Sequence, residues 1–232
     1  MSYRNVVYNG RNRCVNLFTW DTEGKRVMHE CSFEPYLYIE NAAGDKTSIY
    51  GTKVKKRKFN TSFDRSRFVR DSNIKRVFEN MPPAQQFLLD LYWEQNEEKE
   101  FSTHPLKTCL LDIETYSPDT FPDPENPTHT VNVITCYDNF SKKFHTFGIK
   151  PYNGKGVDNL NYVYCKDERE MFIRFIEYLE SDYPDILSGW NSEFFDIPYI
   201  INRIERILGQ EYVVRLSPLG RVHFRAIKGK FG

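Results

Sequence analysis

Two acidic residues stand at the end of a short apolar run near the middle of the chain. Residues 109–111 (Cys-Leu-Leu) lead directly into Asp112-Ile113-Glu114. Side chains at positions i and i+2 of a strand lie on one face, so Asp112 and Glu114 are expected to point the same way, with Cα atoms roughly 6 to 7 Å apart. Two carboxylates ending a buried strand repel each other and are poorly solvated. The pair therefore predicts a site for a hard divalent cation such as Mg²⁺ or Mn²⁺, and an ordinary exposed strand end is the alternative.

A further carboxylate, Asp196, follows much later in the chain. It stands where a short strand has ended and a helix with Pro198 in its first turn begins. One interpretation makes Asp196 the N-cap that accepts hydrogen bonds from the first helical turn. The unusual string around it, residues 190–199 (WNSEFFDIPY), favours a functional role instead.

A basic segment with interleaved aromatic rings lies in the first half of the chain. Residues 53–70 contain one acid, Asp64, three phenylalanines (Phe59, Phe63, Phe68) and eight cationic residues: Lys53, Lys55, Lys56, Arg57, Lys58, Arg65, Arg67 and Arg70. Such a segment can hold phosphates and stack bases. A solvated basic face with phenylalanines in the core explains the same pattern, and the sequence leaves both interpretations open.

The elements before residue 102 predict a small α+β domain. Alternating patterns at 5–8, 14–20 and 36–39 predict strands, with turns at Asn9-Gly10 and at residues 21–24. Pro82-Pro83 begins a predicted helix whose apolar face holds Phe87, Leu88, Leu91 and Tyr92. The acidic stretch 94–100 is the expected linker, so the first domain is expected to span residues 1–101.

The elements of residues 102–232 predict a mixed sheet flanked by helices. Strands are expected at 108–114, 131–137, 143–149 and 185–190. Asp167 to Glu170 resembles a capping box and opens a helix with a buried stripe of Met171, Phe172, Phe175, Ile176 and Leu179. A second helix follows Asp196, with Ile197, Ile200, Ile201, Ile204, Ile207 and Leu208 on one face and Gly209 at its end.

Composition excludes several classes of protein. Lys+Arg and Asp+Glu are both 32, so the whole chain shows no net charge typical of nucleic-acid binding. The five cysteines form no C-x-x-C pair, which argues against structural zinc and against a disulfide framework. No apolar stretch approaches membrane-spanning length and no signal-peptide pattern opens the chain. We therefore expect a soluble cytoplasmic protein that does not contact membranes.

Taken in order, these motifs resemble the first two exonuclease motifs of family B DNA polymerases, in particular those of T-even-type bacteriophages. The resemblance rests on Asp112-Ile-Glu-Thr, Asn191 and residues 195–199, and extends to residues 117–122, 133–138, 187–191 and 215–218. It implies an RNase-H-like 3′–5′ exonuclease domain in which Asp112, Glu114 and Asp196 bind two divalent metals. Asn191 would support the site, and Phe121 would stack on the frayed primer end unless it packs under its own loop.

The resemblance also implies a function in DNA replication. Two metal ions roughly 3.5 to 4 Å apart can activate a water molecule and stabilise the leaving 3′ oxygen, so no nucleophilic side chain is required. The expected activity is proofreading of single-stranded 3′ ends of a primer-template, within an enzyme that also polymerises DNA. The expected location is the host cytoplasm if a phage encodes the chain.

The sequence departs from the family pattern at its end. The third exonuclease motif, Tyr-x-x-x-Asp, is expected well downstream of the second and is not reached, and Tyr183 with Asp185 does not replace it. The polymerase module is also absent. Residues 221–228 read as a strand without a returning partner, so a fragment or split-gene product is expected, weakly active alone and dependent on a C-terminal polymerase chain.

Two rival hypotheses come from other classes. The first is a non-catalytic nucleic-acid-binding module that uses residues 53–70, needs no metal and tolerates loss of Asp112 or Asp196. The second is a stand-alone RNase-H-like nuclease that borrows another acid, for which Asp138 and Asp185 are candidates.

Overall fold

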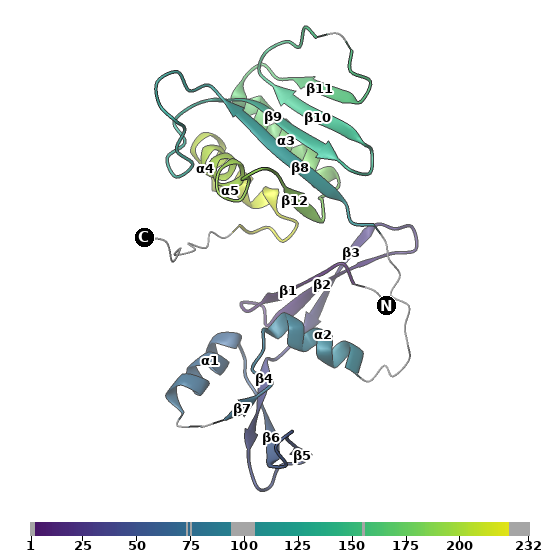
Figure 1. Ribbon diagram of the computed structural model, residues 1–232, viewed down its shortest axis with the longest axis vertical. Coiled ribbons are helices and arrows are strands. Elements are labelled where there is room, and N and C mark those ends of the chain that lie inside the picture. Colours follow the sequence, from purple (N-terminus) through teal and green to yellow (C-terminus); the bar gives the residue numbers. More distant parts are fainter. Residues whose placement is uncertain (1–2, 73, 75, 94–104, 155, 223–232) are drawn as a thin grey trace. The chain divides into compact units, whose positions relative to one another are not determined.

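The computed structural model describes residues 3–72, 74, 76–93, 105–154 and 156–222. It divides into two compact units, residues 1–104 and 105–232 (Figure 1). The expected linker at 94–100 and the expected strand at 223–228 lie outside the described residues. Within the described residues, no helix has the length and apolar character needed to cross a membrane.

The N-terminal unit is α+β, as predicted. An antiparallel sheet has the order β1-β2-β3, with β1 (Asn5–Asn9), β2 (Cys14–Trp20) and β3 (Arg26–Ser32). A second sheet has the order β5-β6-β4-β7, with β4 (Tyr36–Glu40), β5 (Lys46–Thr47), β6 (Lys53–Lys58) and β7 (Val77–Phe78). The helices are α1 (Ser62–Asp71) and α2 (Pro83–Trp93). Strand β3 was not predicted, because it is exposed or half-buried throughout and lacks a clear apolar face.

A buried polar cluster joins α1, α2 and β4, and it changes the interpretation of the basic segment. Arg65 is 5% exposed, and its guanidinium donates to the carbonyl oxygens of Tyr36 at 3.3 Å and Met81 at 2.7 Å. The buried Gln86 amide donates to the Tyr36 carbonyl oxygen at 2.9 Å and its oxygen accepts the Tyr36 N–H at 3.0 Å. Arg65 therefore has a structural role and is not part of an exposed phosphate-binding surface.

The C-terminal unit is built on a mixed sheet, which confirms the predicted fold class. Its order is β11-β10-β9-β8-β12, with β8 (Thr108–Thr115), β9 (Val131–Asp138), β10 (Lys143–Gly148), β11 (Leu160–Tyr164) and β12 (Ile186–Ser188). β8, β9 and β10 are antiparallel neighbours, whereas β11 and β12 run parallel to β10 and β8. The helices are α3 (Glu168–Ser181), α4 (Asp196–Leu208) and α5 (Gln210–Val213), followed by a 3₁₀ turn (Val214–Leu216).

Both long helices pack on the same face of this sheet. The buried stripe of α3 is the predicted set, and Asp167 accepts the Glu170 N–H at 2.8 Å as its N-cap. On the predicted apolar face of α4, Ile197 and Ile207 are partly buried. The other four residues of this face are buried: Ile200, Ile201, Ile204 and Leu208. These side chains meet the alternate residues of β8 that face inward. The other face of β8 is left open, and it carries the two acids.

Candidate functional site

Burial alternates along β8 and separates the acids from the core. Leu111 and Ile113 are buried, whereas Asp112 and Glu114 are exposed. The prediction that both acids share one face is therefore confirmed. The expectation that they are poorly solvated was wrong for these two residues, because none of the helices that the structure describes covers their face.

Of the three candidate carboxylate residues, Asp196 is the buried one, with 3% of its surface exposed. Its Oδ1 accepts the backbone N–H of Ile113 at 3.2 Å. Strand β12 pairs with β8 only from Thr108 to Leu110, so Ile113 lies beyond the end of β12. A buried N–H that has lost its strand partner needs another acceptor, and Asp196 supplies it.

This contact also settles the first interpretation of Asp196. The N-cap of α4 is Phe195, which makes no side-chain cap hydrogen bond, and Asp196 is the first helical residue. Its carboxylate reaches across to β8. The N-cap interpretation was wrong, because the carboxylate accepts the N–H of Ile113, which belongs to a strand distant in sequence.

The contact with Ile113 gathers the three carboxylates around one residue. Burial, and then the negative charges of Asp112 and Glu114, raise the pKa of Asp196, although the N–H group of Ile113 opposes the rise. Asp112 and Glu114 flank Ile113 in β8, and their side chains lie on the open face of the strand, opposite to that of Ile113. The site thus concentrates negative charge, and a bound cation would relieve it.

A close turn between β12 and α4 fixes this geometry. A Cβ at Gly189 would lie 2.2 Å from the carbonyl oxygen of Leu111, so only glycine allows the turn to approach β8 so closely. Asn191 has a left-handed φ of 58°, and its carbonyl oxygen accepts the N–H groups of Phe194 and Phe195 at 3.0 Å each. Ser192 is buried, and its hydroxyl donates to the Gly189 carbonyl oxygen at 3.3 Å. Asn191 thereby shapes the turn that delivers Asp196.

The donor set fits a hard divalent cation in its chemistry, since all three groups are carboxylates. Across the part of the chain that is described, no group of three or more His, Cys, Asp or Glu side chains is gathered closely enough to hold a metal ion. The three carboxylates interact through their charges without forming a closed cage. Asp112, Glu114 and Asp196 therefore stay candidates for metal ligands.

Aromatic rings border the carboxylates. Phe121 is 85% exposed, and its ring centroid lies 5.6 Å from that of Phe195. Phe195 in turn lies 5.7 Å from the buried ring of Tyr199. The sequence reasoning missed two further exposed rings, Trp190 and Phe194, at 94% and 65% exposure. The signal for them was the density of aromatic residues in the turn before Asp196.

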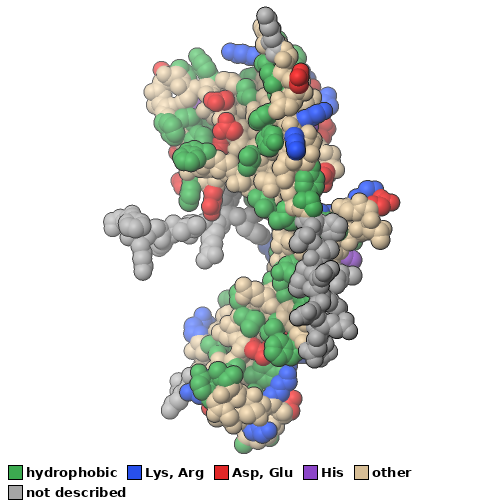
Figure 2. Space-filling model, turned by 45° about the vertical axis from the view of Figure 1, so that its right-hand side comes forward, with side chains coloured by type: hydrophobic (Ala, Val, Ile, Leu, Met, Phe, Trp, Pro, Cys, Tyr) green, Lys and Arg blue, Asp and Glu red, His purple; other side chains and the backbone are tan. Residues whose placement is uncertain are grey.

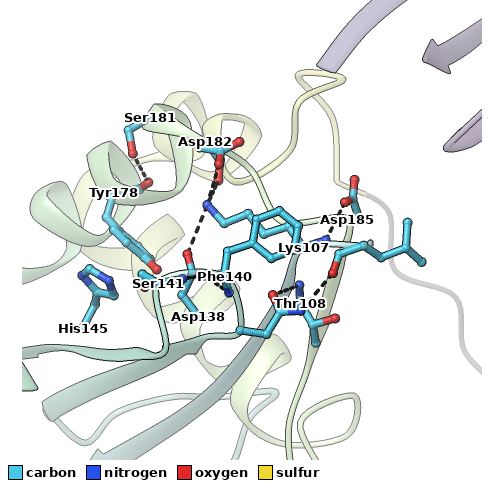
Figure 3. A network of polar contacts seen from close by, with 12 residues as sticks. Lys107, Thr108, Asp138, Phe140, Ser141, His145, Tyr178, Ser181, Asp182 and Asp185 are labelled. Carbon is cyan, nitrogen blue, oxygen red and sulfur yellow. Dashed lines mark hydrogen bonds and ion pairs between the residues drawn. The ribbon is translucent and has the colours of Figure 1, made fainter. Parts of the chain in front are cut away.

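The two acids considered as substitutes have structural roles. Figure 3 shows the ammonium group of Lys107 directed at Asp138 and Asp182. The Lys107 Nζ lies 3.3 Å from Asp138 and 2.7 Å from Asp182, and Asp185 accepts the Lys107 N–H at 2.8 Å. Asp138 pairs with Cys109 in the β8–β9 register, at the opposite end of β8 from Glu114. Asp185 adjoins Ile186, which pairs with Thr108 at that same end of β8.

The basic strand β6 keeps its cations exposed, but several of them contact the protein. The Lys56 ammonium lies 3.5 Å from the ring centroid of Tyr36, and the Arg57 guanidinium lies 4.0 Å from that of Phe68. Lys58 pairs with Glu34 at 3.4 Å. Lys55 is exposed on the same strand. A nucleic-acid contact through Lys55, Lys56, Arg57 and Lys58 stays a prediction.

Comparison with known proteins decides the family. The model of the family described as DNA polymerase family B, exonuclease domain, matches residues 58–231. The chain belongs to this family. The residues that the family model matches include the open face of β8, the turn at Gly189 and Asp196.

Individual relatives of this family B exonuclease domain are polymerases. A DNA-directed DNA polymerase of Escherichia phage RB69 is 27% identical in an alignment that covers 91% of this chain and 26% of the relative. A DNA-directed DNA polymerase of Enterobacteria phage T4 is 26% identical over 91% of this chain and 26% of the relative. A DNA polymerase of Methanocaldococcus jannaschii is 28% identical over 55% of this chain. The chain spans about a quarter of the length of the two phage relatives.

Proposed function

We propose that this chain carries the 3′–5′ exonuclease site of a family B DNA polymerase, which removes 3′-terminal nucleotides during proofreading. The observation that carries the proposal is the meeting of three carboxylates around Ile113: Asp112 and Glu114 from the open face of β8, and Asp196 from the start of α4. The family implies a metal-dependent nuclease. We propose Mg²⁺ or Mn²⁺ as the metal, because the ligands are carboxylate oxygens.

The exposed and the buried carboxylates would have different roles. Asp112 and Glu114 are open to solvent and would bind the cation, and the cation would hold the phosphate. Asp196 is held by the N–H of Ile113, so its orientation is set before any ligand arrives. A bound pair of divalent ions would supply an activated water and charge stabilisation for the leaving oxygen.

A strand-degradation assay tests the activity. A 5′-labelled single strand is incubated with Mg²⁺ or Mn²⁺, and we expect shortening from the 3′ end that the double variant Asp112→Ala/Glu114→Ala abolishes. Both side chains are exposed, so the variant should fold, which circular dichroism checks. The matched control is Asp158→Asn, an exposed acid in the loop before β11. Equal shortening by the double variant would place the nuclease elsewhere.

Cation binding gives a second readout that does not depend on turnover. Calorimetric titration with Mn²⁺ should show weak binding, because the carboxylates form no closed cage and ligand number sets affinity. Asp112→Ala should abolish it, and Asp158→Asn should leave it unchanged. Binding that survives Asp112→Ala would move the cation site away from β8.

The proposed substrate and partner are inferred from the names and the lengths of the relatives. We propose single-stranded 3′ ends of a primer-template as the substrate, and a polymerase module as the partner, on the same chain or on a second one. The relatives' names and their greater length support this assignment. Adding the purified polymerase module should increase the rate of 3′ shortening, and an unchanged rate would argue against the partnership.

A further inference from the structure

The turn that delivers Asp196 also presents a large apolar ring to solvent. Phe194 is 65% exposed and stands two residues before Asp196. A single exposed phenylalanine is ordinary on a protein surface. Here, however, Phe121 is also exposed and lies against Phe195, the residue between Phe194 and Asp196. Figure 2 shows acidic and hydrophobic side chains close together on the surface of the C-terminal unit.

The backbone holds Phe194 in place. Its N–H is bonded to the carbonyl oxygen of Asn191 at 3.0 Å, and the Ile197 N–H is bonded to that of Ser192 at 2.9 Å. The next residue, Phe195, is half-buried and packs against Tyr199. The exposed ring is therefore mounted on a fixed turn, so little backbone freedom would be lost when a ligand packs on it.

The side chains of this site indicate which class of ligand could pack on the Phe194 ring. An exposed aromatic ring on the turn that leads into Asp196, in a site whose carboxylates attract a cation, suits a molecule with a planar apolar face and a negatively charged backbone. Unpaired nucleobases on a phosphate strand have both properties, and stacking on an aromatic ring accepts every base. A base that remains paired inside a duplex does not expose its face for such stacking.

We propose that Phe194 is a base-stacking residue of this site, additional to Phe121, that binds an unpaired base of single-stranded DNA. The inference rests on the proposed function, because it takes the carboxylate site as the place where the strand is held. Phe194 positions the strand and does no chemistry. It favours unpaired over paired 3′ ends without selecting a sequence.

Binding of a short single strand labelled with 2-aminopurine near its 3′ end tests the proposal, with Ca²⁺ as the only divalent ion, so that the carboxylates hold a cation while cleavage is suppressed. Stacking on a protein ring changes the fluorescence of this base analogue. Phe194→Ala and Phe194→Leu should each weaken binding about fivefold or more, because both remove the aromatic face. Phe194→Tyr should bind like the unchanged protein. The matched control is Phe140→Ala, which removes a 51% exposed ring from the loop after β9.

The outcomes separate this inference from the proposed function. Unchanged binding by Phe194→Ala, or binding by Phe194→Leu as tight as by Phe194→Tyr, would overturn the stacking role. If carboxylate-dependent shortening with Mg²⁺ persists in that case, the proposed function stands. Ring-dependent binding without shortening in any variant would support the stacking residue and would contradict the nuclease.

Discussion

Asp196 has one stabilising and one destabilising effect on the folded chain. Its carboxylate satisfies the N–H of Ile113, which stabilises the junction of β8 and α4. The same carboxylate is buried beside Asp112 and Glu114, so burial and their charges raise its pKa. A group with a raised carboxyl pKa destabilises the fold when it is ionised, and this cost disappears as the pH falls below the ordinary aspartate value.

Asp196→Asn should therefore raise the melting temperature at neutral pH without divalent ions. The amide oxygen can still accept the Ile113 N–H, while the buried charge is gone. The difference in melting temperature between the variant and the unchanged protein should shrink as the pH is lowered toward about 4. Added Mg²⁺ should stabilise the unchanged protein more than the variant, because the variant has one carboxylate ligand fewer.

Asp196→Ala is the matched comparison for that experiment. It leaves the Ile113 N–H buried without an acceptor, which costs about 1 to 3 kcal/mol. Thermal unfolding of the three proteins, with and without Mg²⁺, gives the measurement. A melting temperature of Asp196→Asn below that of the unchanged protein at pH 7 would show that charge repulsion is not the dominant effect.

At the scale of elements, the junction between β12 and α4 depends on one glycine. In Gly189→Ala the new Cβ would meet the Leu111 carbonyl oxygen, so the turn must move away from β8 and carry Asp196 with it. We expect 3′ shortening to fall on the order of a hundredfold. Gly156→Ala is the control, since nothing lies within 4 Å of a Cβ there. Full activity of Gly189→Ala would show that the turn has other room to adjust.

Lys107 joins the start of β8 to the end of β9 and to the segment after α3. Burial acts to raise the pKa of Asp138, but the N–H groups of Ser141 and Phe140 and the charge of Lys107 outweigh it, so the pKa is lowered. A lowered carboxyl pKa gives stability that is present above about pH 4 and is lost as the pH falls through the folded value.

Lys107→Met should lower the free energy of unfolding by about 3 kcal/mol at pH 7, because it leaves the buried Asp138 charge unpaired. The deficit should shrink as the pH falls below about 4 and through the lowered pKa of Asp138, because the charge that Lys107 stabilises is then lost. Adding Asp138→Asn to Lys107→Met should recover part of the loss. Urea unfolding measures all three, with Lys166→Met, an exposed lysine before α3, as control. A deficit that is independent of pH would point to weaker packing instead.

For the whole molecule, the formal net charge of zero hides a local asymmetry in the N-terminal unit. β6 presents exposed cations along one strand, although Lys56, Arg57 and Lys58 also contact rings or an acid of the unit. These intramolecular contacts are weak at exposed sites, so they do not prevent phosphate binding.

Replacing Lys55, Lys56 and Lys58 together by Gln should weaken binding of single-stranded DNA and flatten its salt dependence. The slope of log K against log salt should decrease by about 0.7 for each phosphate that the variant no longer neutralises. Fluorescence anisotropy over a salt series gives the slope. Lys25→Gln, on the turn between β2 and β3, is the control. An unchanged slope would mean that β6 is a solvated basic face.

Local patterns in the sequence were sufficient for the elements with a strong apolar period. The stripes of α3 and α4, and the shared face of Asp112 and Glu114, follow from side-chain periods of 3.6 and 2 residues. β11 and β3 were not predicted, because their burial is partial along the whole strand. A period is visible only where one face is fully buried and the other is not.

Residue types and local spacing were enough to predict which side chains could bind a cation and on which face of β8 two of them lie. They did not predict that Asp196 bonds to Ile113, that Arg65 and Gln86 are buried, or that Lys107 contacts Asp138. The reason is that each of these polar groups is placed by a partner distant in the chain. Where β12 stops along β8 decides which N–H needs an acceptor, and no local pattern contains that register.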